Sequence, residues 1–276
     1  MLPNRMEKMM EKYLIKPGTK FSLNDFDPDD TSRFSGGKEE AQNKIQDLTE
    51  KLDKLQEIFY AEHKHKLLIV LQARDAGGKD GTIRSVFGGI NPQGVHVSSF
   101  KVPTEYEMDH DYLWRVHQQV PGRGEIVVFN RSHYEDVLVV RVHNIIDKKK
   151  CEKRYLQIKN FEKLLADEGT TILKFYLHIS RDEQKKRLQE RLDDPQKNWK
   201  FNPGDLKERE LWAEYSTAYE AAIQETSTDW APWYVIPANH NWYRNLSIAS
   251  IIVKTMEQLN LQYPVTDLDP KTIVIK

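Results

Sequence analysis

The chain has a single cysteine, Cys151, among its 276 residues, which excludes an intramolecular disulfide and a zinc site built on several thiolates. It has no run near the ~20 apolar residues that a membrane span needs, and its start contains no apolar core of signal-peptide length. Charge of one sign is not in excess, because 41 lysines and arginines face 42 aspartates and glutamates. The sequence therefore predicts a cytoplasmic protein that binds neither a membrane nor a nucleic-acid polymer.

Material for a folded core is plentiful. The 6 tryptophans, 12 tyrosines and 10 phenylalanines exclude wholesale disorder. We expect an irregular, extended arm over residues 1–37, which Phe21, Phe26 and Phe34 fix to the body unless the arm is frayed. A single domain is expected over residues 38–276.

Short apolar runs alternate with amphipathic stretches along this domain. Continuous apolar runs are typical of strands buried on both faces, and they are found at 66–72, 125–130, 171–180 and 233–237. Helices are expected at 38–62, 81–88, 104–120, 149–168, 182–192, 206–226 and 242–259. The alternation predicts an α/β fold with a parallel sheet between helices, and ligands bound at the carboxyl ends of the strands.

The first of these strands leads into a glycine-rich turn and then a helix, ARDAGGKDGT at 73–82. In such a turn successive backbone N–H groups point at one spot, and a lysine adds a cation for phosphate oxygens. The pattern G-x-x-x-x-G-K-[ST] is matched by Gly78 and Lys79, but not by Ala73 or Asp80. A tight turn with a solvated lysine is the alternative. The candidate phosphate-contacting residues are Ala76, Gly77, Gly78, Lys79, Asp80 and Gly81.

Asp75 is the unusual residue of this turn. A carboxylate among phosphates is repulsive unless a divalent cation lies between them. Asp75 is therefore a candidate ligand for Mg²⁺.

The strand at 125–130 ends at Asn130, where phosphotransferases with a phosphate-binding loop usually carry a metal-binding aspartate. Arg131 follows and can clamp a phosphoryl group with two parallel N–H donors. The alternative is that Arg131 pairs with Glu135 or Asp136 and only closes the strand end.

A basic helix and loop follow the third strand. Arg187 and Arg191 lie four positions apart and so share a helix face. After a phosphate-binding core, such a segment predicts a lid, at about 181–205, that excludes water and neutralises charge. A solvated charged face, with Glu183 and Glu190 as partners of the arginines, is the alternative.

The segment 98–115 lies between the two strand ends and offers Lys101 and Arg115. Its aromatic residues are expected in the core. His110, His117 and His133 show no metal-ligand spacing, and we expect them at the surface or behind the site.

Six strings, in this order and spacing, resemble the family-2 polyphosphate kinases. The resemblance covers nearly the whole chain, from about Pro17 to Leu259. The strings are QARDAGGKDGTI, SFKVPTE, HDYLWR, GEIVVFNRSHYEDVLVVRV, DDPQKNWKF and APWYVIPAN.

This resemblance implies a thymidylate-kinase-like P-loop fold of three layers, α/β/α, with a helical lid. It implies Mg²⁺-dependent, reversible phosphoryl transfer between inorganic polyphosphate and a nucleotide, AMP, ADP or ATP, and it favours a homo-oligomer. By motif, Asp75 would bind the metal, while Lys79, Arg131 and Arg191 would hold phosphates during catalysis. Arg115 would meet the acceptor phosphate.

The second motif departs from the family pattern. Many members read Asp-Arg-Ser-Trp-Tyr-Asn where this chain has Asn130 to Glu135. The variant is similar to the class III subgroup, which phosphorylates nucleoside monophosphates and diphosphates. We expect Glu135 to influence acceptor choice by recruiting a second cation where AMP leaves space, and Asn130 to offer a neutral oxygen.

Two other functions share parts of this pattern. An ATP-dependent nucleoside monophosphate kinase has the same loop, lid and fold, and a non-catalytic module could bind nucleotide or polyphosphate without turnover. A polyanionic substrate also requires a polarised surface despite the net charge of −1. We expect acidic residues only at metal positions or on outer faces, and a basic groove made by Lys79, Lys101, Arg115, Arg131, Arg187 and Arg191.

Overall fold

The computed structural model describes residues 9, 11–266, 272, 273 and 275. Their centre is a six-stranded sheet in the order β1-β6-β5-β2-β4-β3. All neighbouring strands run parallel except β1, which pairs antiparallel with β6. The strands are β1 Leu14–Ile15, β2 Lys66–Ala73, β3 Val95–Ser99, β4 Ile126–Asn130, β5 Thr170–His178 and β6 Trp233–Pro237.

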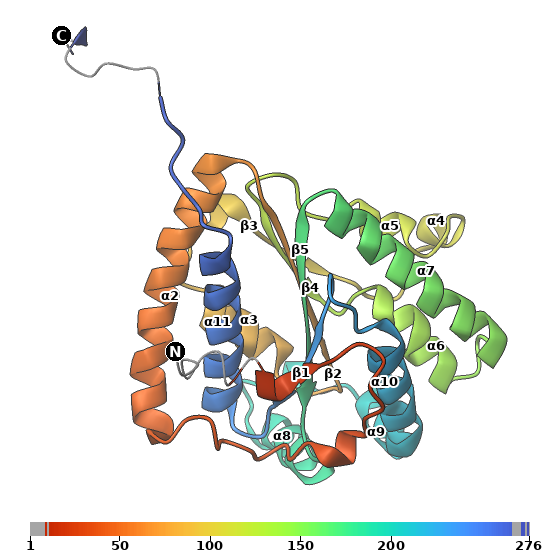
Figure 1. The fold of residues 1–276 in the computed structure, drawn as a ribbon. Coiled ribbons are helices and arrows are strands. Elements are labelled where there is room, and N and C mark those ends of the chain that lie inside the picture. Colours follow the sequence, from red (N-terminus) through yellow and green to blue (C-terminus); the bar gives the residue numbers. More distant parts are fainter. Residues whose placement is uncertain (1–8, 10, 267–271, 274, 276) are drawn as a thin grey trace.

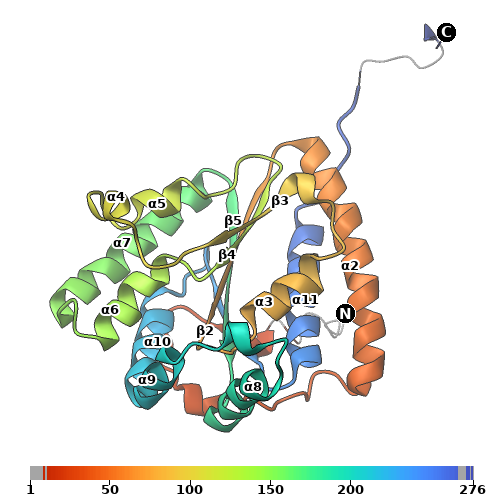
Figure 2. The same ribbon diagram turned by 180° about the vertical axis from the view of Figure 1, so that it is seen from behind.

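Helices cover both faces of the sheet, and this confirms the predicted α/β/α architecture (Figures 1 and 2). One face carries α2, α3 and α11, and the other carries α5, α6, α7 and α10. The helices are α2 Gly37–Glu62, α3 Lys79–Phe87, α4 Glu105–Met108, α5 Trp114–His117, α6 Val139–Val142, α7 Lys148–Asp167, α8 Arg181–Asp193, α9 Gly204–Glu210, α10 Trp212–Thr226 and α11 Asn241–Gln258.

The apolar run of β2 divides its side chains between two cores. Leu67, Ile69 and Leu71 pack with α2 and α11, whereas Leu68 and Val70 pack with α7 and α10. This alternation follows from the two-residue period of a strand, and it explains why the run shows no polar face.

Some predicted elements differ from those observed. The helix expected at 104–120 is two single turns, α4 and α5, because Thr104 caps the first and the Asp111 carboxylate accepts from Leu113 N (2.9 Å). The helix expected at 206–226 divides at Leu211 into α9 and α10. Two strands were not predicted: β3, and β1, which lies in the arm expected to be irregular.

The arm of residues 11–36 lies against the body. Ile15 pairs with Trp233 as part of β1, and the Phe34 ring packs 6.3 Å from the Trp242 ring. Phe21 and Phe26 pack edge to face and join the second core. The arm is therefore fixed by the phenylalanines, as expected, and residues 1–8 and 10 of the predicted arm lie outside the described residues.

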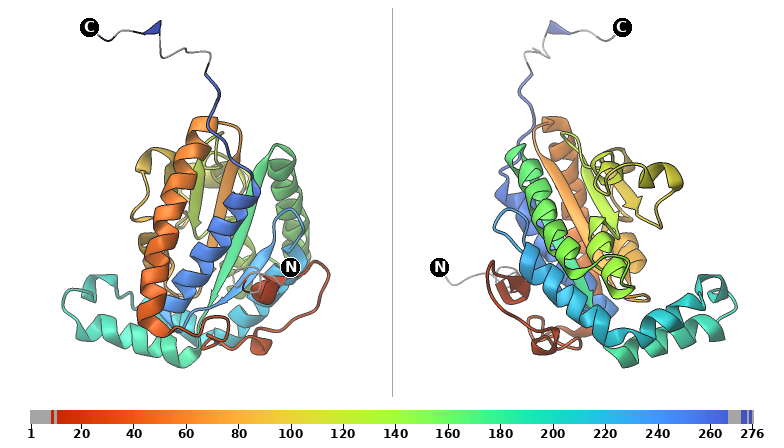
Figure 3. Two further views of the ribbon diagram at one scale, coloured as in Figure 1. Left: turned by 60° about the vertical axis from the view of Figure 1, so that its left-hand side comes forward. Right: turned by 90° about the vertical axis from the view of Figure 1, so that its right-hand side faces the viewer.

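The carboxyl ends of the parallel strands meet at one edge of the sheet, where the loop to α3 and the start of α8 also lie. From this edge α8 and the segment leading to α9 project beyond the body (Figure 3). The predicted site residues lie at this edge, except Arg115, which lines neither cavity there.

Candidate active site

The first loop, defined here as residues 74–78, joins β2 to α3. Ala76 and Gly78 have positive φ angles of 58° and 100°. A Cβ atom on Gly78 would lie 2.0 Å from Arg244 Nη1, so only glycine fits there. This tight turn delivers the chain to the N-terminus of α3, where unpaired N–H groups favour an anion.

Neighbouring side chains hold the carbonyl groups of the first loop. Gln184 Nε2 donates to Asp75 O (3.0 Å) and Arg187 Nη1 donates to Ala76 O (3.1 Å), both from α8. Arg244 Nη1, from α11, reaches Gly77 O at 3.5 Å. Three carbonyl oxygens that would repel a phosphate are thereby occupied by donors.

Lys79 is the first residue of α3, and its Nζ donates to Ala73 O (3.0 Å). Burial lowers the pKa of Lys79, and the Arg131 charge lowers it further. The carboxylates of Asp75, Glu135 and Asp80 act in the opposite direction. Charged residues that follow both β2 and β4 thus lie close enough to Lys79, the predicted phosphate lysine, to shift its pKa.

The second loop, defined here as residues 131–135, follows β4. Arg131 adopts a positive φ of 62°, and its Nη2 donates to Asp75 Oδ1 (3.0 Å). Burial opposes its charge, but Glu135 and Asp75 outweigh burial and raise the pKa of Arg131. Arg131 therefore faces the first loop, and neither Glu135 nor Asp136 closes an ion pair with it in the part of the chain that the structure describes.

A second bond joins the elements next to the two loops, the end of β4 and the start of α3. Asn130 Nδ2 donates to Asp80 Oδ1 (2.7 Å), across the same gap that Arg131 and Asp75 bridge. The residues expected to meet at the ends of neighbouring strands do so.

These residues open into a groove of about 1470 Å³, above the ~300–1,000 Å³ of ordinary small-molecule sites. Ten of its lining residues are basic and five are acidic. The basic ones are Lys38, Lys79, Lys101, Arg131, Lys186, Arg187, Arg191, Lys197, Lys200 and Arg244. The acidic ones are Asp75, Asp80, Glu183, Glu190 and Asp205. The groove is net basic, but the expectation that acids stay at metal positions or on outer faces is wrong.

Two of these acids pair with the arginines of α8 instead. Arg187 Nε donates to Glu183 Oε1 (2.8 Å), and its Nη2 donates to Ala238 O (2.6 Å). Arg191 Nη1 lies 3.4 Å from Asp205 Oδ2. Arg187 thus fixes α8 to the first loop, while Arg191, in the last turn of α8, lines the groove.

Lys101 and Arg115 are separated by the structure. Lys101 lines the groove, whereas Arg115 does not, because it is buried beside Phe100 and donates to Lys101 O (2.9 Å). The structure therefore brings Arg115 behind the groove wall. Among the histidines, His117 is exposed and His133 is fully buried behind the second loop.

A smaller cavity of about 310 Å³ adjoins the groove, and Asp75 and Arg131 line both. Tyr215, Tyr219 and Trp212 give it aromatic walls, and Glu135 faces it. Burial raises the pKa of Glu135, against the pull of Arg131 and Lys79. Sequence reasoning missed this cavity, although the i, i+4 spacing of the two tyrosines places them on one helix face.

The donor set suits a hard cation. Among the described residues no group of three or more His, Cys, Asp or Glu side chains could hold a metal ion by itself. Mg²⁺ is commonly bound by one or two carboxylates, with phosphate and water oxygens as the other ligands. Asp75, at the junction of the two loops, fits that pattern.

No helix of the described residues is long and apolar enough to cross a membrane.

Comparisons with known proteins show which family this chain resembles. The chain is 62% identical to an AMP/ADP-polyphosphate phosphotransferase of Meiothermus ruber, over 97% of this chain and 100% of that protein. It is 43% identical to an ADP-polyphosphate phosphotransferase of Rhodopseudomonas palustris, over 95% and 94%. The crystal structure of polyphosphate kinase 2 from Arthrobacter aurescens TC1 matches with a TM-score of 0.92 at 43% identity, over 95% and 94%. The model of the family "Polyphosphate kinase 2 (PPK2)" matches residues 35–264, and the chain belongs to that family.

Proposed function

We propose that this protein transfers the terminal phosphoryl group of inorganic polyphosphate directly to AMP or ADP, reversibly and with Mg²⁺. The observation that carries the proposal is the junction of the two loops, where Lys79, Arg131 and Asp75 meet in a net basic groove. Relatives that match almost the whole chain and are named polyphosphate phosphotransferases support this donor and these acceptors.

The two cavities suggest a division of the substrates. The long basic groove suits a polyanionic chain, whose charge its ten lysines and arginines offset. The smaller aromatic cavity suits a nucleoside, because rings stack on Tyr and Trp side chains. We assign polyphosphate to the groove and the nucleoside to the smaller cavity, with the reacting phosphates at the shared wall of Asp75 and Arg131.

Catalysis then consists of positioning and charge neutralisation. An oxygen of the acceptor phosphate attacks the terminal phosphorus, and the bond to the next polyphosphate unit breaks with its electron pair leaving on the shortened chain. Lys79 and Arg131 hold the transferred group from the two loops, and Arg191 adds charge from the lid. Asp75 would hold Mg²⁺, which when bound would supply positive charge to offset that of the phosphates.

The decisive assay uses purified protein, AMP, long-chain polyphosphate and Mg²⁺, with no other donor. We expect ADP and ATP to form while the polyphosphate shortens, and turnover to stop on chelation and return with Mg²⁺. Efficient use of ATP as donor, without use of polyphosphate, would show an ordinary monophosphate kinase. Binding of polyphosphate without turnover would show a non-catalytic module.

Glu135 provides a test of acceptor choice. Its carboxylate lines the smaller cavity, not the groove. Replacing Glu135 by Asn should lower the rate with AMP more than the rate with ADP, because the shorter acceptor leaves more space for a cation beside the carboxylate. Rates with both acceptors at saturating polyphosphate measure this, and an unchanged ratio would contradict the role.

A homo-oligomer and a cytoplasmic location remain predictions. The division into an arm, a domain and a lid also remains a prediction, and residues 267–271, 274 and 276 of the predicted domain lie outside the described residues.

A further inference from the structure

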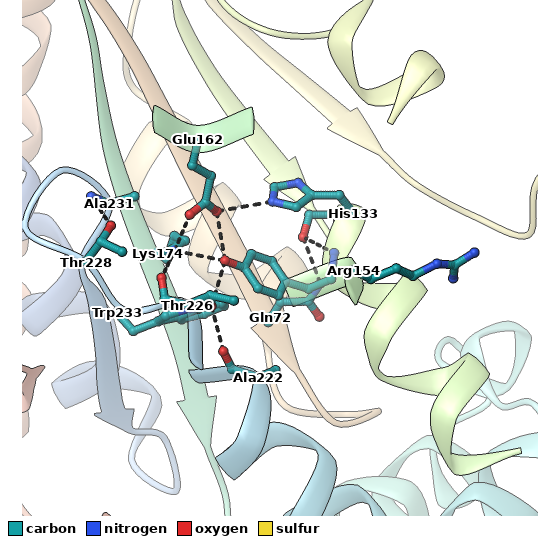
Figure 4. A network of polar contacts seen from close by, with 12 residues as sticks. Gln72, His133, Arg154, Glu162, Lys174, Ala222, Thr226, Thr228, Ala231 and Trp233 are labelled. Atoms are coloured by element: carbon teal, nitrogen blue, oxygen red, sulfur yellow. Dashed lines mark hydrogen bonds and ion pairs between the residues drawn. The ribbon is translucent and has the colours of Figure 1, made fainter. Parts of the chain in front are cut away.

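A fully buried ion pair lies behind the second loop. Lys174 of β5 and Glu162 of α7 are both inaccessible to solvent, and Lys174 Nζ lies 2.6 Å from Glu162 Oε2 (Figure 4). Lys174 also donates to Tyr134 OH and to Thr226 O, each at 2.8 Å. All three donors of the ammonium group are thus used, and two of the three acceptors belong to residues outside the second loop.

The other oxygen of Glu162 binds the second loop itself. Tyr134 OH donates to Glu162 Oε1 (2.8 Å), and His133 Nε2 lies 3.2 Å from the same oxygen. Both side chains are fully buried. The side chains of two consecutive residues of the second loop therefore contact the same buried carboxylate.

Ser132 is anchored by a separate partner. With its oxygen facing Ser132, the buried amide of Gln72 accepts from Ser132 N (3.1 Å) and Oγ (3.0 Å). In that orientation the amide nitrogen donates to Glu135 Oε1 (3.0 Å). Ser132 Oγ in turn accepts from Tyr134 N (3.2 Å).

The loop is thus divided between core and site. The side chains of its three middle residues are buried in the core, while its two outer residues, Arg131 and Glu135, line the cavities. Arg131 holds a left-handed backbone, which is unfavourable for a non-glycine residue. Such a conformation persists only where the surroundings fix it.

Stability alone does not account for the ion pair. Replacing a buried pair by apolar side chains of similar volume is often neutral or stabilising. A buried hydrogen-bonded pair does, however, fix the directions of the groups bound to it. We propose that Lys174, Glu162 and Tyr134 are positioning residues that hold Arg131 and Glu135 at the junction of the two loops. Only the effect on kcat that this inference predicts rests on the proposed function.

The main test removes the pair as a unit, with the variant Lys174→Met/Glu162→Met. We expect the variant to stay folded, with a lower melting temperature because Thr226 O and His133 Nε2 lose their partners, while kcat for phosphoryl transfer falls about tenfold to hundredfold because Arg131 is misplaced. KM for polyphosphate should change less than about twofold, because the groove residues are intact.

A milder variant, Tyr134→Phe, removes one hydroxyl and leaves the ion pair in place. Hydrogen exchange of the backbone amides of residues 131–135, followed by mass spectrometry, should accelerate about tenfold or more while the rest of the sheet keeps its protection. Thr255→Val is the matched control. Its buried hydroxyl donates to Ile251 O (2.9 Å) within α11, on the other face of the sheet, so its loss should leave kcat and the exchange of residues 131–135 unchanged.

The outcomes separate the two hypotheses. Wild-type kcat in the folded double variant, or in Tyr134→Phe with unchanged exchange of residues 131–135, overturns the positioning role. If the double variant does not fold, Tyr134→Phe decides alone. A wild-type protein that does not use polyphosphate counts against the proposed function, while the exchange measurement still decides whether the network holds the loop.

Discussion

The two loops at the junction are held in opposite ways. Each contains a non-glycine residue with positive φ, Ala76 in the first loop and Arg131 in the second. The first loop is fixed from outside, because Gln184, Arg187 and Arg244 donate to its carbonyl groups. The second loop is fixed by its own side chains, which form hydrogen bonds with buried partners.

The difference bears on which part of the molecule holds each loop. Gln184 and Arg187 belong to α8, so the first loop is tied to a helix that projects beyond the body. The partners of the second loop lie in β2, β5 and α7, which form the body of the protein. A change in the position of α8 would therefore act on the carbonyl groups around Asp75 and not on the partners of the second loop.

The largest effect should come from removing either the cation that follows the first loop or the cation of the second loop. Lys79→Met and Arg131→Met should each lower kcat about 10³-fold, since each group offsets charge on the transferred phosphoryl group. If both act on one group, the double variant should be less than about tenfold worse than either single one. Steady-state rates with AMP and polyphosphate measure this.

Lys44→Met, at an exposed position of α2, is the control and should leave kcat unchanged. Losses of the two single variants that multiply fully in the double variant would show that the loops act on different groups.

A smaller effect should follow from loosening the first loop alone. Gln184→Leu leaves Asp75 O without its donor and removes one of the two acceptors of Arg209 Nη1, which should lower the free energy of unfolding by about 1–3 kcal/mol. kcat should fall about tenfold, and exchange should accelerate at 74–78 but not at 131–135.

Gln56→Leu is the matched control for this variant. Gln56 is equally buried in α2, and its Oε1 has no partner among the described residues, so the change should be neutral or stabilising. Equal acceleration of exchange in both loops of Gln184→Leu would contradict the separation of the two supports.

The free energy of unfolding should depend on pH through Asp205, which lines both cavities. Burial and the nearby Asp75 carboxylate raise its pKa to about 6, against the pull of Arg191 and Arg131. Between about pH 4 and 6 the folded state thus binds this proton more tightly than the unfolded state, so the group's contribution to stability falls as pH rises.

Comparison with Asp205→Asn isolates this contribution. The stability of the wild type relative to the variant should decrease from pH 4 to about 6.5 and then stay level, as measured by chemical denaturation at each pH. A difference that is constant across this range would show that Asp205 has an ordinary pKa.

The smallest expected effect concerns backbone strain. Ala76→Gly should raise the free energy of unfolding by up to about 1 kcal/mol, because glycine relieves the left-handed backbone. Ala221→Gly, inside α10, should instead lower it by about 1 kcal/mol. Thermal denaturation measures both, and a loss of stability in Ala76→Gly would show that the methyl group is needed for packing.

Much of the fold could be predicted from the sequence, because buried parallel strands leave continuous apolar runs such as 66–72. β3 and β1 could not, since β3 is a half-exposed edge strand and β1 is only two residues long. Their pairing depends on partners that local pattern does not reveal.

For the site, sequence predicted the groups at strand ends, because parallel topology brings such ends together. It did not predict Arg244 or Gln184, whose roles depend on where α11 and α8 pack. Arg187 shows the same limit. It makes four hydrogen bonds, one to Glu183 of its own helix and three to backbone carbonyl groups, and so it fixes the position of α8. The sequence had predicted a cation of a lid that contacts the substrate.

The pairing of β1 with β6 has a consequence for protein synthesis. Tyr13 and Tyr243, whose hydroxyls meet beside this pairing, are 230 positions apart. At ~5–20 residues per second, the arm waits roughly 10–50 s on the ribosome before its partner emerges. A chain released before Trp233 lacks the strand that pairs with Leu14 and Ile15, which leaves this part of the arm unpaired and open to proteases.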